Sequence, residues 1–133
     1  MKKVVVTYKD DDYDVELTIR QATVMDGMDR SANMALIHAQ PFDVGKASNT
    51  DRFRRFMLMQ TYSACLAVTE IVNHGTKKLK KDISPDDFLE LPDGLVVPWD
   101  NTVFELNPHW VMRTKEDDEK SSGEVLAPSA AKS

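Results

Sequence analysis

Few side chains in this sequence have the type and spacing that covalent catalysis requires. The single cysteine, Cys65, and His74 are the one nearby pair that suggests a thiolate nucleophile. On a helix with about 100° per residue, positions 65 and 74 fall on opposite faces, so the imidazole would not activate the sulfur. We therefore interpret Cys65 as a buried, unreactive thiol and predict no catalytic residue.

Metal and cofactor sites are also poorly supported by the sequence. The acidic run from Asp10 to Glu16 imitates a calcium loop, but Val15 occupies the glycine position and Gln21 the final glutamate position. We interpret this run as a turn with a solvated acidic edge. No two histidines have the i, i+4 helical spacing of a zinc site. We expect no metal and no cofactor; the histidines are His38, His74 and His109.

Two groups of side chains are candidates for binding another molecule. One cluster contains the arginines at positions 52, 54 and 55, and another contains the lysines at positions 77, 78, 80 and 81. Such clusters can hold phosphates. The net charge of −5 favours the simpler interpretation of a solvated face that complements a helix dipole. Methionines can form an adaptable surface for apolar helices, although core packing is the simpler explanation. The methionines concerned are Met25, Met28, Met34, Met57 and Met59.

The composition is that of one globular domain. The chain has 133 residues, of which 41% are hydrophobic and 29% charged. Its acidity makes duplex DNA or an anionic membrane a poor main partner, so nucleic acid binding is not favoured. No apolar stretch approaches the roughly 20 residues of a membrane span. With one cysteine, the chain suits a reducing compartment, and we expect a soluble cytoplasmic protein.

Residues 1–19 are predicted to form a β-hairpin. The segment from Tyr13 to Ile19 alternates apolar and polar residues, and the segment from Lys3 to Tyr8 is rich in valine. Aspartates at positions 10 to 12 suit the turn between them. Because a two-stranded hairpin is marginal alone, we expect it to pack on the rest of the domain.

Residues 20–112 are predicted to form a helical core. A first helix should begin after Thr23, with Asp26 completing a capping box, and end near Ala39 before Pro41. Its apolar residues recur at three- and four-residue steps, as one stripe. A long central helix is predicted from about Thr50 to His74, closed by Gly75 in a left-handed conformation.

The remaining segments are shorter. A helix from Pro85 to about Leu91 is predicted behind the cap Ser84. A turn at residues 92–94, an extended piece at residues 96–97 and a last helix over residues 100–106 should follow. Residues 113–133 are charged and contain serine, glycine and proline, so we predict a disordered tail. The predicted fold class is therefore mainly α (α+β), with a single domain over residues 1–112.

Two stretches resemble the tail assembly chaperones of long-tailed bacteriophages. The first runs from Val15 to Met28, a strand that leads directly into a helix, and the second from Leu91 through Trp99 to Pro108. The likeness extends over most of residues 1–112. The resemblance implies a non-enzymatic protein of the host cytoplasm that binds the helical tape-measure protein, can self-associate, and is often extended by a ribosomal frameshift.

On this likeness, the candidate partner-binding residues are Met25, Met28 and Phe53. Two alternatives remain open: a phage connector or scaffold-type structural subunit, and a small helical nucleic-acid-binding adaptor. Phosphate binding should weaken steeply with salt, whereas binding of an apolar helix should not.

Overall fold

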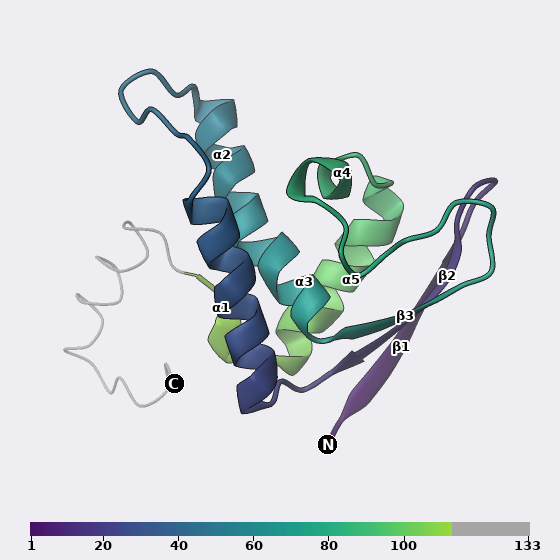
Figure 1. The fold of residues 1–133 in the computed structure, drawn as a ribbon. Helices are drawn as coiled ribbons and strands as arrows, with labels where there is room; N and C mark the ends of the chain where they lie inside the picture. The colour runs from purple at the N-terminus through teal and green to yellow at the C-terminus, as the bar shows by residue number, and fades with distance from the viewer. Residues whose placement is uncertain (113–133) are drawn as a thin grey trace, which may run out of the picture.

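The computed structural model describes residues 1–112, in which a small antiparallel sheet lies beside a group of helices (Figure 1). This arrangement confirms the predicted fold class, an N-terminal hairpin packed on a mainly helical domain. The predicted disordered tail, residues 113–133, lies outside the described residues.

The sheet contains strands β1 (Lys3–Lys9), β2 (Asp14–Arg20) and β3 (Thr69–Asn73), in the order β1-β2-β3. Both pairings are antiparallel, and Val6 lies opposite Leu17 in the hairpin. Val15, Leu17 and Ile19 of β2 are fully buried, as the alternating pattern predicts. The hairpin prediction is confirmed, and β3 is a strand that the sequence pattern did not indicate.

The predicted central helix is too long at its C-terminal end. The helical path consists of α2 (Asn49–Met57), the π-helical turn η1 (Leu58–Tyr62) and α3 (Ser63–Ala67). Beyond Val68 the chain becomes β3, in which Ile71 lies opposite Leu17 of β2. Tertiary pairing thus overrides the helical pattern, because the β-branched residues of this segment complete the ladder on the free side of β2.

Gly75 has a different role from the predicted one. No described residue has a positive φ. Instead, a Cβ at Gly75 would lie 2.6 Å from both the Asp12 oxygen and the Asp14 nitrogen. The flanking backbone bonds to the same turn, from His74 N to Asp14 O at 2.7 Å and from Lys77 N to Asp12 O at 2.9 Å. Glycine is therefore required here by the close approach of two backbones.

The local signals for the starts of α1, α2 and α4 are accurate. Helix α1 (Val24–His38) has the predicted capping box between Thr23 and Asp26. Ser48 caps α2, and Ser84 caps α4 (Pro85–Leu89). Each cap hydroxyl accepts a hydrogen bond from a backbone N–H of the first turn, which explains why a serine or threonine locates the start.

The predicted turn and extended piece at residues 92–97 are wrong. Helix α5 (Asp93–Leu106) begins earlier and continues through Pro98, and the short turn η2 (Pro108–Trp110) follows it. Burial explains the difference, since a stripe on this helix packs into the core and compensates for the bond that proline cannot make. The buried members of the stripe are Leu95, Trp99, Val103 and Leu106.

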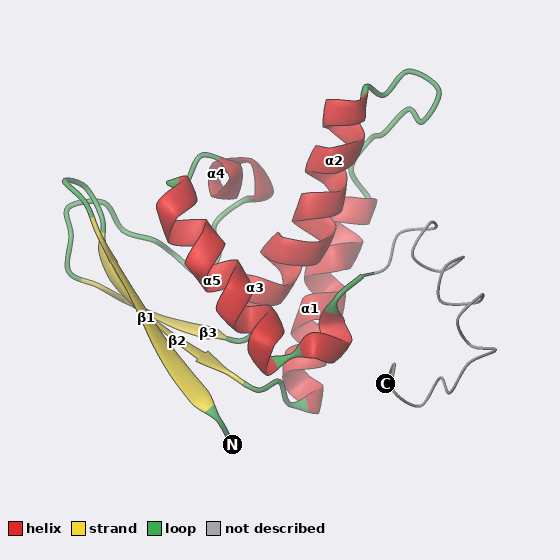
Figure 2. Ribbon diagram, turned by 180° about the vertical axis from the view of Figure 1, so that it is seen from behind, coloured by secondary structure: helices red, strands yellow, loops and turns green. Residues whose placement is uncertain are grey.

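Trp99 joins the sheet and the helices. Helix α5 lies across the inner face of the sheet (Figure 2), and the Trp99 indole Nε1 donates to Thr69 Oγ1 of β3 at 2.8 Å. The ring centroid of Phe88 is 5.9 Å from that of Trp99, and the centroid of Tyr62 is 5.3 Å from that of Phe88. One aromatic chain therefore connects β3, α5, α4 and the long helical path.

Candidate functional site

The most prominent surface feature is an apolar face of α1 that no other described element covers. Met25 is 63% exposed and Met28 is 60% exposed, and both lie in the first turns of the helix. We call this surface the outer face of α1. Its exposed apolar residues are Val24, Met25, Met28, Ala32, Ala35 and Leu36. A contiguous apolar surface of this kind is typical of an interaction site.

The opposite face of α1 is anchored to the domain by polar contacts. Arg20, at the end of β2, donates to both carboxylate oxygens of Asp26, at 3.0 and 2.8 Å. Asp26 also closes the capping box by accepting from the Thr23 backbone N–H at 3.0 Å. The hydrogen bonds from Arg20 hold the pKa of the buried Asp26 carboxyl below its usual value. A charged residue therefore occupies the inner side of the first turn.

Further along the inner face, Arg30 stacks on the ring of Trp110, with its guanidinium carbon 5.0 Å from the ring centroid. Its Nη2 donates to the Trp110 carbonyl at 3.0 Å, and burial lowers the pKa of Arg30. Ile37 is the apolar residue of this helix that is fully buried. Because Asp26 and Arg30 face the domain, the outer face of α1, which carries Met25 and Met28, points into solvent.

The junction before α1 fixes the direction in which the helix faces. Asn107, fully buried after α5, accepts from the Ala22 backbone N–H at 2.8 Å. Its Nδ2 donates to the Arg20 carbonyl at 3.1 Å. This amide satisfies the backbone between β2 and α1 and so ties the start of α1 to the end of α5.

The structure separates the three predicted partner-binding residues into two places. Met25 and Met28 share the outer face of α1, so the core-packing interpretation is wrong for them, whereas Met34, Met57 and Met59 are partly buried. Phe53 is 55% exposed but belongs to α2. Helix α2 extends past the C-terminal end of α1 (Figure 1), where Arg55 contacts His38. Phe53 therefore lies far from the methionines, since α1 is roughly 20 Å long.

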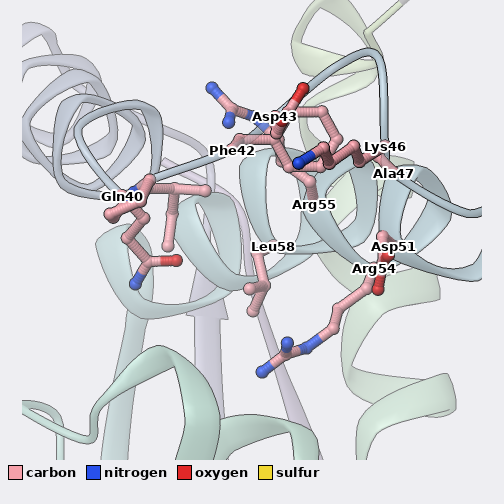
Figure 3. Close-up of a pocket in the computed structure, with 11 residues that line it drawn as sticks. Gln40, Phe42, Asp43, Lys46, Ala47, Asp51, Arg54, Arg55 and Leu58 are labelled. Carbon is pink, nitrogen blue, oxygen red and sulfur yellow. The ribbon is translucent and has the colours of Figure 1, made fainter.

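The predicted arginine cluster is engaged in contacts within the domain. Arg54 and Arg55 of this cluster line a pocket of about 290 Å³ between α2 and the loop that follows α1 (Figure 3). Arg54 forms an ion pair with Asp86 at 2.5 Å, and the Arg55 guanidinium carbon lies 4.6 Å from the centroid of the Phe42 ring. These contacts support the structural interpretation of the cluster.

Cys65 and His74, the one pair that could suggest a thiolate nucleophile, are not in contact. Cys65 is fully buried, as predicted, and burial raises the pKa of its thiol well above the ordinary value. His74 lies at the end of β3, where its Nε2 is 3.1 Å from Glu16. Within residues 1–112 there is no group of three or more side chains arranged to hold a metal ion.

Comparisons with family models, curated proteins and solved structures found no match to this chain. None of the helices in residues 1–112 is long and apolar enough to cross a membrane.

Sequence reasoning found the apolar stripe of α1 but not the direction in which it points. Val24, Leu36 and the two alanines belong to that predicted stripe, but they were not selected as partner-binding residues. A signal existed in the opposite stripe, where Asp26 and Arg30 are spaced one helical turn apart. This spacing shows which side of α1 faces the domain only when the contacts of Asp26 with Arg20 and of Arg30 with Trp110 are known.

Proposed function

We propose that this protein is a non-enzymatic tail assembly chaperone of a long-tailed bacteriophage, which binds the tape-measure protein in the host cytoplasm. The observation that supports the proposal is the outer face of α1, with Met25 and Met28 exposed beside smaller residues. The sequence resemblance supplies the identity of the partner.

The outer face of α1 is long enough and apolar enough to bind one helix of a partner. From Val24 to Leu36 it extends roughly 18 Å along the helix axis, about three turns. Methionine side chains adapt to differently shaped apolar partners, and the alanines allow a close approach of the partner backbone. A chaperone that must hold different stretches of a long amphipathic helix needs this tolerance.

The test is co-purification of a coexpressed tape-measure protein with Met25→Glu and Met28→Glu variants. Both positions are exposed, so thermal unfolding should be unchanged, while capture of the partner should fall at least tenfold because a charge would be buried in an apolar interface. Val44→Glu is the matched control, since Val44 is an equally exposed apolar residue on the loop after α1.

Three results would contradict the chaperone proposal or the binding face assigned to it. If the wild-type protein and the Met28→Glu variant captured equal amounts of the tape-measure protein, α1 would not be part of the interface. Normal tail assembly after deletion of the gene would favour the connector or scaffold alternative. A steep loss of binding with salt would instead favour the nucleic-acid adaptor.

A further inference from the structure

The free edge of β1 presents unpaired backbone groups. Gln21 N donates to Lys2 O, and Asp10 N donates to Tyr13 O, at the two ends of the hairpin. In an antiparallel ladder the hydrogen-bonded pairs alternate, so the even-numbered residues of β1 bond to β2. The N–H and C=O groups of the odd-numbered residues therefore point away from the sheet; these residues are Lys3, Val5, Thr7 and Lys9.

No described element covers this edge. The strand order places β1 at the outside of the sheet, and α5 packs on the inner face (Figure 2). Within residues 1–112, none of the outward backbone groups of Lys3, Val5 and Thr7 has a hydrogen-bond partner. Val5 is 58% exposed on the outer face. A seven-residue edge with a valine-rich centre is an open template for another strand.

The charges at the ends of β1 indicate what kind of strand fits. Lys3 lies directly opposite Arg20, a like-charged neighbour that is already engaged by Asp26 and Glu70. In the described part of the chain, neither Lys3 nor Lys9 forms an ion pair. A strand added to the edge would place its own side chains beside these lysines. A carboxylate is favoured most strongly beside Lys3, which faces Arg20, and less strongly beside Lys9, which lies opposite Asp14.

We propose that the β1 edge binds an extended, acidic segment of a partner protein, which adds a fourth strand to the sheet. Backbone hydrogen bonds to Val5 and Thr7 hold the segment, and carboxylates at its ends meet Lys3 and Lys9. A second copy of this chain is a poorer occupant, because antiparallel pairing of the whole strand sets Lys3 of each copy against Lys9 of the other. This surface is separate from the outer face of α1.

The test uses a fluorescein-labelled synthetic peptide, Glu-Val-Thr-Val-Thr-Val-Glu, titrated with the full chain and followed by fluorescence polarisation. Val5→Pro removes one outward N–H and should weaken binding at least tenfold, since proline is tolerated at edge strands but cannot donate. Val5→Thr retains the donor and is the matched control. Lys3→Glu should weaken binding severalfold by charge reversal.

A second measurement keeps the test decisive if the proline variant unfolds. Hydrogen exchange in the wild-type chain should slow at the Val5 and Thr7 amides when the peptide is added, and not at Val4 or Val6, which already bond to β2. Met28→Glu should bind the peptide normally, so failure of the α1 proposal would not affect this result.

Three outcomes would overturn the proposal. The first is equal binding by the Val5→Pro and Val5→Thr variants, and the second is peptide binding without protection of the Val5 amide. The third is concentration-dependent dimerisation that Val5→Pro abolishes while the peptide fails to bind, which would assign the edge to a second copy of the chain.

Discussion

Gly27 and Gly75 have opposite environments, although both stand near a helix or strand terminus. An added Cβ at Gly27 in α1 would have no atom within 4 Å, whereas at Gly75 it would meet the backbone of the hairpin turn at 2.6 Å. The need for glycine at position 75 therefore comes from contact between distant segments, not from the backbone conformation of the residue itself.

We predict opposite effects of alanine at these two positions. Gly27→Ala should stabilise the domain by about 0.5 to 1 kcal/mol through helix propensity. Gly75→Ala should destabilise it by about 1 to 3 kcal/mol, because the hairpin turn must move. Urea unfolding measures both, and a neutral Gly75→Ala variant would contradict the close approach.

The Arg20–Asp26 pair makes stability depend on pH. The pKa of Asp26 is lowered in the folded state, so its contribution is present above the unfolded value of about 3.9 and is lost as pH falls through the folded value. At neutral pH, Asp26→Asn should cost up to about 3 to 5 kcal/mol, since it leaves Arg20 without its buried partner.

The measurement is the free energy of unfolding of wild type and Asp26→Asn at a series of pH values. The difference should be constant above about pH 5 and shrink as pH falls below about 4, where wild type begins to lose the pair. A difference that does not change with pH would show that the carboxylate charge is unimportant. Asp29→Asn, on the exposed side of α1, is the control.

At the scale of elements, α3 and β3 differ in how deeply they are buried. Leu66 in α3 is 3% exposed, whereas Ile71 in β3 is partly buried. The sequence pattern placed both residues on one central helix, but only the α3 part of that segment is enclosed on all sides.

Leu66→Ala should cost about 2 to 5 kcal/mol by leaving a cavity, and Ile71→Ala should cost less because its site is open on one side. Denaturant unfolding of both variants gives the comparison. A cost below about 0.5 kcal/mol for Leu66→Ala would contradict the central position of α3, and an equal cost at both sites would contradict the strand assignment of Ile71.

At the scale of the whole molecule, the contacts that close the domain reach to residue 112. The Arg30 guanidinium stacks on the Trp110 ring, and the Met112 backbone N–H donates to Gln60 Oε1 at 3.0 Å. These contacts tie the C-terminal end of the described chain to both α1 and η1.

Truncation after Met112 should leave the melting temperature nearly unchanged, because residues 113–133 lack a hydrophobic pattern. Truncation after Asn107 is the informative control, since it removes Trp110 and should lower the melting temperature by several degrees through loss of the Arg30 contact. A large drop on the first truncation would mean that the tail packs on the domain. Differential scanning calorimetry measures both.

Local chemistry was sufficient where a few neighbouring residues decide the structure. The capping hydroxyls of Thr23 and Ser84 each satisfy a nearby backbone N–H, so the starts of α1 and α4 were predictable. The alternation in β2 likewise identified its buried face. Residue type made Met25 and Met28 candidate contacts, but it did not distinguish an exposed methionine from one packed in the core.

Tertiary structure decided what depends on distant partners. Residues 69–73 leave the helical path because they pair with the free side of β2. Helix α5 continues through Pro98 because its buried stripe, which includes Trp99, packs into the core and against the sheet. The outward direction of Met25 and Met28 follows from Arg20, Trp110 and Asn107, which hold the polar side of α1 against the domain. A periodic pattern defines a face of a helix, but only the elements that pack against the helix determine whether that face is buried.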